Sequence, residues 1–146
     1  MWQTYCRAAN IDSKQRHDIW KFCGGGAAAD ELAHLVLAGV KTATASTKLA
    51  YEIEKEDLPV IGTYSVILFD NEKAACIIRD TKVTIVPFRQ VSAEHAYKEG
   101  EDDRSLHKWR EVHRRAFAPD YAAVGLDFDE NGACVLEEFE VVYPQI

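Results

Sequence analysis

The sequence predicts a small α+β domain in which helices flank a mixed, mostly antiparallel β-sheet. Two observations favour this class. Between residues 63 and 88, runs of β-prone residues follow one another with no helical pattern between them. Before and after these runs, apolar residues recur at helical spacing. Consecutive strands of this kind pair antiparallel and can curl into a barrel, whereas a doubly wound fold needs strands and helices in alternation.

Length and composition fit one domain. The chain has 146 residues, of which 47% are hydrophobic, enough to bury a core of its own. We expect a single domain over residues 1–146, with residues 1–25 as an N-terminal helical extension. No run approaches the roughly 20 apolar residues of a membrane span, and the N-terminus lacks the pattern of a signal peptide. No membrane partner is therefore expected, and the expected location is cytoplasmic.

Two helices are predicted in the first third of the chain. Residues 11–23, "IDSKQRHDIWKFC", place apolar residues at roughly helical spacing before "CGGG" interrupts the pattern. Residues 27–40, "AAADELAHLVLAGV", place Leu32, Leu35 and Val36 on one face. Helices therefore precede the expected sheet.

Strands dominate the middle and the end of the chain. After the polar segment "YEIEKEDLP", the runs "TYSVILF" and "AACIIRDTKVTIVPF" predict strands joined by a turn at "DNEK", the second as one long or two broken strands. "VSAEHAYKEGEDD" predicts a short helix that ends near Gly100, and "SLHKWREVHRRAFA" predicts a longer one. The final "ACVLEEFEVVY" alternates apolar and acidic residues, as a half-buried closing strand does.

The net charge limits the possible partners. The chain has 17 basic and 24 acidic residues and a formal net charge of −7 at pH 7. A protein that binds polyanions without specificity is usually basic. Residues 1–50 carry a charge of +2 and residues 51–146 a charge of −9. Any surface that binds an anion must therefore be local.

No metal or other cofactor is expected. The four cysteines lie far apart in sequence, form no C-x-x-C pair and have no histidine at a zinc-ligand offset. Such cysteines usually fill a core. His107 and His113 are six residues apart and fall on different faces of their predicted helix. On the same helix, the basic residues Lys108, Arg110, Arg114 and Arg115 either contact phosphates or form a solvated face.

The segment "GVKTATAS", residues 39–46, contains a single lysine. Lys41 is the only Lys, Arg, Asp or Glu between Glu31 and Lys48. From spacing alone it is either a solvated cation that the dipole of the preceding helix favours, or part of a site.

Five stretches carry a resemblance to a known family. "WKF", "ADELAHLVLAGVKTATAS", "ACIIRDTKVTIVPF", "EGEDDRSLHKWREVH" and "CVLEEFEVVY" resemble, in order and spacing, the longer bacterial proteins of the ASCH (activating-signal-cointegrator homology) family within the PUA-like superfamily. The resemblance covers most of residues 20–143. Residues 39–46 are similar to the family signature G-x-K-x-x-T-x-R, except that Ser46 replaces the arginine. The resemblance implies a small PUA-like β-barrel with flanking helices, and a cleft for RNA or a modified nucleoside.

The resemblance also implies an activity. Small ASCH proteins hydrolyse the amide of N4-acetylcytidine, and their catalytic lysine, threonine and glutamate resemble Lys41, Thr44 and Glu99. We therefore expect an amidohydrolase acting on an acylated pyrimidine nucleoside. Two alternatives stay open: a non-catalytic RNA-binding module of PUA-like type, and a ribonuclease acting on single-stranded RNA, since a longer member has that activity. The candidate substrate-binding residues are Ser46, Arg79 and Arg110, and no oligomeric state is predicted.

The chemistry of the three candidate catalytic residues fits amide hydrolysis. That reaction needs a nucleophile, a base and a group that stabilises the oxyanion, and Thr44, Lys41 and Glu99 can divide these roles. On a regular strand, however, Lys41 and Thr44 would point to opposite faces. The three side chains therefore converge only if a turn or bulge separates the first two.

Overall fold

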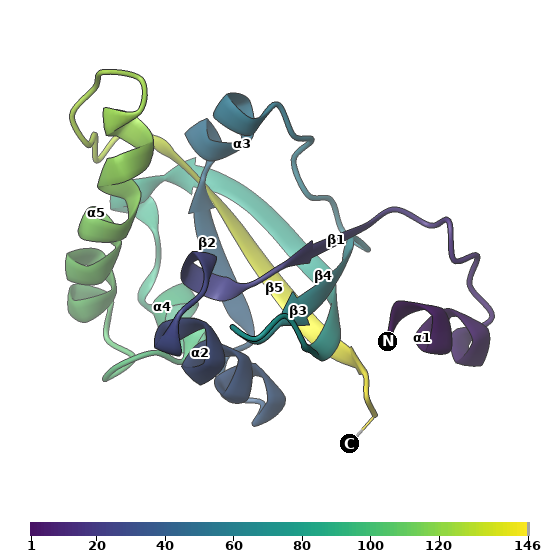
Figure 1. Ribbon diagram of the computed structural model, residues 1–146. Coiled ribbons are helices and arrows are strands. Elements are labelled where there is room, and N and C mark those ends of the chain that lie inside the picture. Colours follow the sequence, from purple (N-terminus) through teal and green to yellow (C-terminus); the bar gives the residue numbers. More distant parts are fainter. Residues whose placement is uncertain (146) are drawn as a thin grey trace.

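The computed structural model describes residues 1–145 and is built around one five-stranded sheet (Figure 1). The strand order is β1-β3-β4-β5-β2. The pair β1 and β3 is parallel, and the three other pairs are antiparallel. The bounds of the strands are β1 His17–Trp20, β2 Ala43–Thr47, β3 Tyr64–Leu68, β4 Ala74–Pro87 and β5 Ala133–Tyr143. The expected α+β class with a mixed, mostly antiparallel sheet is confirmed.

The sheet is open, so the predicted barrel is not observed. Strands β1 and β2 form its two edges and do not pair with each other within residues 1–145. The longest strands, β4 and β5, pair over most of their length, with register shifts at Ile77/Ile78 and at Asp80/Lys82. Such bulges bend a strand and increase its twist. They curve the sheet without closing it.

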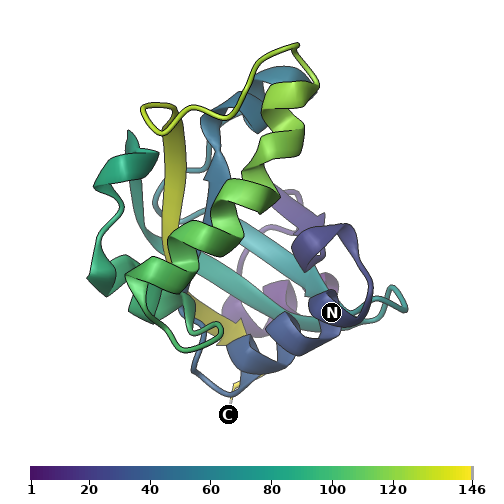
Figure 2. The same ribbon diagram turned by 90° about the vertical axis from the view of Figure 1, so that its left-hand side faces the viewer.

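Helices surround the sheet (Figures 1 and 2). Helix α5 runs diagonally across the view of Figure 2, with α2 below it. Among the described residues, no helix has both the length and the apolar character that a membrane span requires. The helix bounds are α1 Trp2–Ala9, α2 Ala27–Leu37, α3 Lys48–Glu54, α4 Ala93–Glu99 and α5 Leu106–Ala122, with short 3-10 helices η1 Phe22–Gly24 and η2 Phe88–Gln90.

The helix predicted over residues 11–23 is wrong. His17–Trp20 forms strand β1, which pairs in parallel with β3. Ile19, which the helical pattern placed among the apolar residues, is 59% exposed. The N-terminal helix is α1 instead, and it buries Trp2 and Tyr5 against β3 and β4. Residues 1–25 are therefore helical only in part, and the single-domain organisation stays a prediction.

The other predicted elements are present with small changes. Residues 74–87 form one long strand, α4 ends at Glu99 before Gly100, and α5 continues beyond the predicted helix to Ala122. The polar segment "YEIEKEDLP" begins inside helix α3. Three of the four cysteines, Cys6, Cys76 and Cys134, are buried and free, as core-filling residues are, whereas Cys23 is exposed.

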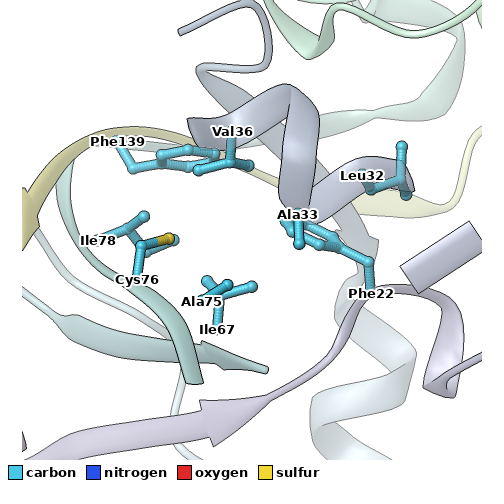
Figure 3. Close-up of a cluster of buried hydrophobic side chains, with 9 residues drawn as sticks. All are labelled: Phe22, Leu32, Ala33, Val36, Ile67, Ala75, Cys76, Ile78 and Phe139. Atoms are coloured by element: carbon cyan, nitrogen blue, oxygen red, sulfur yellow. The ribbon is translucent and has the colours of Figure 1, made fainter. Parts of the chain in front are cut away.

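Two apolar clusters bring the ends of α2 and α4 together. The first joins η1 and α2 to the sheet through residues such as Phe22, Val36 and Phe139 (Figure 3). The second packs α4 and α5 on the sheet around Trp109 and Leu136. Because Leu136 and Phe139 are an odd number of residues apart on β5, their side chains lie on opposite faces of that strand. The segment that follows α2 meets the C-terminal end of α4, where the Thr42 N–H donates to the Lys98 carbonyl at 2.8 Å.

Candidate active site

Lys41 lies in the turn that connects α2 to β2. The chain leaves the helix through Gly39, whose φ of 74° lies in the left-handed region that glycine adopts without strain. The backbone N–H groups of Val40 and Lys41 then both donate to the Leu35 carbonyl, at 3.0 and 3.1 Å. This turn sends the Lys41 side chain into the protein, where it is 1% exposed. The interpretation of Lys41 as a solvated cation at a helix end is therefore wrong.

Two carboxylates hold the buried Lys41 ammonium. Its Nζ lies 3.4 Å from Glu99 Oε1 and 2.7 Å from Glu101 Oε2. The same nitrogen lies 5.3 Å from the centre of the Phe22 ring of η1. A buried charge without a partner would cost several kcal/mol, on the order of the penalties measured for disrupted buried ion pairs. The pairing explains how this lysine is tolerated inside the protein.

Glu99 is the centre of a buried hydrogen-bond network. Its carboxylate is 1% exposed and accepts hydrogen bonds at Oε2 from Trp109 Nε1 at 2.5 Å and from His95 Nε2 at 2.9 Å. His113 Nε2 lies 3.7 Å from Oε1. Burial by itself raises the pKa of Glu99, but the Lys41 ammonium, the nearby His113 ring and the hydrogen bond from His95 together hold it well below its ordinary value. Glu99 is therefore ionised at neutral pH.

The end of α4 and the loop after it hold the two carboxylates against Lys41. Gly100 has a φ of 71°, and a Cβ at this position would lie 2.6 Å from the Val40 carbonyl oxygen. Glycine is therefore needed where the loop crosses the turn that carries Lys41. Glu101 follows directly, and its side chain is 25% exposed. Glu99 is therefore held inside the protein, next to Lys41, while Glu101 contacts Lys41 from a partly exposed position.

Thr44 does not join this network directly. It is half-buried on β2, directly opposite Glu137 of β5. Neighbouring Ala45 packs with the cluster under α5, so the Thr44 side chain lies on the other face of the strand. Within residues 1–145, no hydrogen bond joins Thr44 to Lys41 or Glu99. The structure therefore brings two of the three candidate catalytic residues into contact and leaves the third separate.

The candidate substrate-binding residues are spread over the molecule. Ser46 follows Thr44 on the same face of β2, and its Oγ lies 3.4 Å from the Tyr51 hydroxyl. Arg79 lies 3.8 Å from Glu140 at a largely exposed position. Arg110 donates to the Arg89 carbonyl at 3.2 Å. The contacts of the described chain link neither arginine to Lys41 or Glu99, so their assignment stays a prediction.

The other charged groups of α5 are mostly paired with acids. Arg114 lies 2.7 Å from Glu130, and both Lys108 and Arg115 lie within 4 Å of Glu111. This pairing favours the solvated-face interpretation of the basic cluster over phosphate contact. Across residues 1–145, no three His, Cys, Asp or Glu side chains are grouped so that they could hold a metal ion.

Sequence reasoning missed four residues of this site. It assigned no role to Glu101, Trp109 or His95, and it considered His113 only as a metal ligand. A signal existed in the i, i+4 spacing of His95 with Glu99, and of Trp109 with His113, which puts each pair on one helix face. The sequence could not show that both helices point these faces at Lys41.

We expect Trp109→Phe to destabilise the fold, because it removes the indole N–H that donates to the buried Glu99 carboxylate. A hydrogen bond to a charged group contributes roughly 1.5–3 kcal/mol, so the free energy of unfolding in urea should fall by about that amount. Trp20→Phe is the matched control, since no hydrogen bond of its indole N–H occurs within the described residues. Equal losses for the two variants would contradict the role of the Trp109 N–H.

Comparison with known proteins supports one family. A model of the ASCH domain matches residues 18–143. The crystal structure of an ASCH domain from Lactobacillus crispatus JV V101 is 32% identical, covers 97% of this chain and 94% of that chain, and superposes with a TM-score of 0.84. Protein EF3133 from Enterococcus faecalis V583 is 37% identical over 97% of this chain and 85% of that chain, with a TM-score of 0.87.

The remaining comparisons give no information about function. The hypothetical protein PH0355 is 15% identical over 77% of this chain and 93% of that chain, with a TM-score of 0.50, and shows a likeness of fold only. No curated protein matches the chain at a significant level. The family match spans the turn with Lys41, the helix that ends at Glu99, and the strands that position them. The chain therefore belongs to the ASCH domain family.

Proposed function

We propose that this protein is a metal-independent amidohydrolase that acts on an acylated pyrimidine nucleoside such as N4-acetylcytidine. ASCH domains are PUA-like domains that are generally associated with RNA, which supports a substrate derived from RNA. One observation carries the proposal: Lys41 of the family signature is buried and paired with the equally buried Glu99.

A buried ion pair contributes little net stability to a fold, because both charges lose their hydration. Replacing such a pair by well-packed apolar residues is often neutral or stabilising, by as much as roughly 4 kcal/mol. A buried lysine next to an ionised carboxylate whose pKa is strongly perturbed is, however, common at catalytic sites. The network of Trp109 and His95 around Glu99 orients the carboxylate as a catalytic group requires.

The three candidate residues have distinct roles in this proposal. The Thr44 hydroxyl attacks the acyl carbon, and the Lys41 ammonium stabilises the oxyanion that forms on the carbonyl oxygen. Glu99 holds the Lys41 ammonium in place through their ion pair. Glu101 Oε2 occupies the position 2.7 Å from Lys41 Nζ that the substrate oxygen needs, so Glu101 must move aside when substrate binds. Its partial exposure allows this movement without rearrangement of the core.

A second candidate function is a non-catalytic module that binds RNA through the same region. The separation of Thr44 from the ion pair favours it, because a nucleophile that is ready to react usually contacts its base. In such a module, Lys41 would contact a phosphate or a base carbonyl once Glu101 has moved. A ribonuclease is the third candidate.

Incubation of the purified protein with N4-acetylcytidine and with single-stranded RNA, followed by chromatography, separates these functions. The proposal predicts cytidine and acetate from the first substrate and intact RNA from the second. Shortened RNA would support the ribonuclease. Unchanged substrates together with measurable RNA binding would support the module.

Removal of metal ions should leave the activity unchanged. The proposed roles need only side chains of the chain itself, and lysine with threonine can promote acyl transfer without a Lewis acid. Turnover of N4-acetylcytidine should therefore be equal before and after dialysis against a chelator. Activity lost on dialysis and restored by zinc or manganese would contradict this expectation.

A further inference from the structure

A second group of buried polar residues lies beside Thr44, and the proposed mechanism leaves it unused. Glu137 is the direct cross-strand partner of Thr44, so the two side chains share one face of the sheet about 5 Å apart at Cβ. Asp80 of β4 pairs with Phe139, two residues beyond Glu137 on β5, so the side chains of Asp80 and Glu137 lie on the same face of the sheet. Asp80 is 1% exposed and Glu137 is 8% exposed.

The surroundings of Asp80 and Glu137 favour the retention of a proton. Asp80 Oδ2 is buried and has no hydrogen-bond donor among the described residues. Neighbouring carboxyls of like charge disfavour double ionisation. Burial and the adjacent Glu137 carboxyl raise the pKa of Asp80 to about 9, and burial raises that of Glu137. The pair therefore holds one proton at neutral pH.

The surroundings of the carboxyl pair keep that proton in place. Asp18 from β1 adds negative charge, and the Tyr51 hydroxyl from α3 lies 3.4 Å from Glu137 Oε1 and 3.4 Å from Ser46 Oγ. None of these neighbours is a cation. Ser46 occupies the last position of the family signature, where an arginine is usual, and it points to this same face of β2. A guanidinium at this position would favour the doubly ionised pair.

We propose that Glu137, sharing its proton with Asp80, is the general acid that protonates the leaving nitrogen of the amide. This inference rests on the proposed function. An amine is a poor leaving group unless it gains a proton as its bond to carbon breaks. The acid must stand next to the nucleophile, and Glu137 is the residue paired with Thr44 across the strands.

The atoms balance over two steps. In the first, the Thr44 oxygen bonds to the acyl carbon, the C–N bond breaks, the hydroxyl proton goes to solvent, and the nitrogen takes the proton of the carboxyl pair. In the second, a water oxygen bonds to the acyl carbon, the bond to Thr44 breaks, and the Thr44 oxygen takes one proton of that water. The carboxyl pair then regains a proton from solvent. One water is consumed, and a carboxylic acid and an amine are formed.

The choice of leaving group tests this role. Glu137→Gln keeps the size of the side chain but cannot supply the acidic proton. It should slow hydrolysis of N4-acetylcytidine by about a hundredfold or more, the usual range for loss of a general acid. Hydrolysis of 4-nitrophenyl acetate should change by less than about threefold, because 4-nitrophenolate leaves without a proton. Lys41→Ala, in contrast, should slow both reactions.

The outcomes separate the inference from the proposed function. Wild-type protein that hydrolyses neither compound would overturn both. Wild-type turnover of the amide with equal losses on the two substrates in Glu137→Gln, or with no loss, would overturn the inference alone. Because a folding defect would also slow both reactions equally, the variant's thermal unfolding is compared with that of the wild type, and a well-folded variant with equal losses counts against the inference.

Ser46→Arg provides a second and independent measurement. A cation beside the pair should lower the pKa of the carboxyl pair, so the fall of kcat/KM on the alkaline side should begin at lower pH than in the wild type. Carbon NMR titration of the Asp80 and Glu137 carboxyls should show the same shift directly. Wild-type carboxyls that both ionise below pH 5, or an alkaline limb that Ser46→Arg does not move, would contradict the shared proton.

Discussion

Replacement of Lys41 by alanine is expected to lower the turnover of N4-acetylcytidine by about a hundredfold or more, because it removes the cation that we propose stabilises the oxyanion. The same change leaves Glu99 buried and ionised without its partner. Loss of one member of a buried pair costs roughly 3–5 kcal/mol, so the protein should also unfold at a lower urea concentration. Stopped assays by chromatography and urea unfolding measure the two effects.

Two further variants separate the catalytic effect from the loss of stability. Lys41→Arg keeps the positive charge near Glu99 but changes its shape, so it should restore most of the stability and little of the turnover. Lys48→Ala removes a lysine whose side chain is 43% exposed and should change neither quantity measurably. Normal folding, full turnover and full ligand affinity in Lys41→Ala would show that the buried lysine has no functional role.

Replacement of Thr44 by alanine is expected to abolish turnover while the fold and ligand binding remain close to those of the wild type. The Thr44 hydroxyl is half-buried and makes no hydrogen bond within residues 1–145, so its removal should change the free energy of unfolding by less than about 1 kcal/mol. The loss of a nucleophile, in contrast, removes the covalent route altogether. Turnover and binding are measured on the same preparation.

Thr84→Ala is the matched control, since Thr84 is also half-buried in a strand of this sheet but lies away from Thr44 on the other face. It should keep full activity.

Glu99→Gln also separates an enzyme from a binding module. Neutralising this carboxylate should abolish the turnover of an enzyme, whereas it should leave the affinity of a binding module nearly unchanged. Full turnover in Thr44→Ala would exclude Thr44 as the nucleophile.

Much of the fold followed from local patterns. Helix α2 and strand β5 show clear periodicities, and both occur close to the predicted bounds. Strand β1 did not follow, because four residues with two exposed side chains carry no pattern of their own and are held by parallel pairing with β3. The state of the sheet, open rather than closed, depends on whether β1 and β2 meet at long range, which no local pattern encodes.

Only part of the candidate site could be predicted from the sequence. The resemblance to the family singled out Lys41 and Glu99, and the structure places them in contact. The turn at Gly39 and Val40 explains why the Lys41 side chain points into the protein. It does not bring Lys41 into contact with Thr44. The contribution of Glu101 depends on how the loop after α4 packs against Lys41, 60 residues away in sequence, and that of Trp109 on how α5 packs against the end of α4. Periodicity within one element contains no such information.

The central claim is that the ASCH signature of this chain is catalytic and does more than bind. Proton NMR of N4-acetylcytidine mixed with wild-type protein tests it directly, because one sample reports both the release of acetate and, through saturation transfer, the binding of the nucleoside. We predict acetate release by the wild type, and binding without release by Thr44→Ala. Binding of the nucleoside with no release of acetate by the wild type would contradict the claim and identify the protein as a binding module.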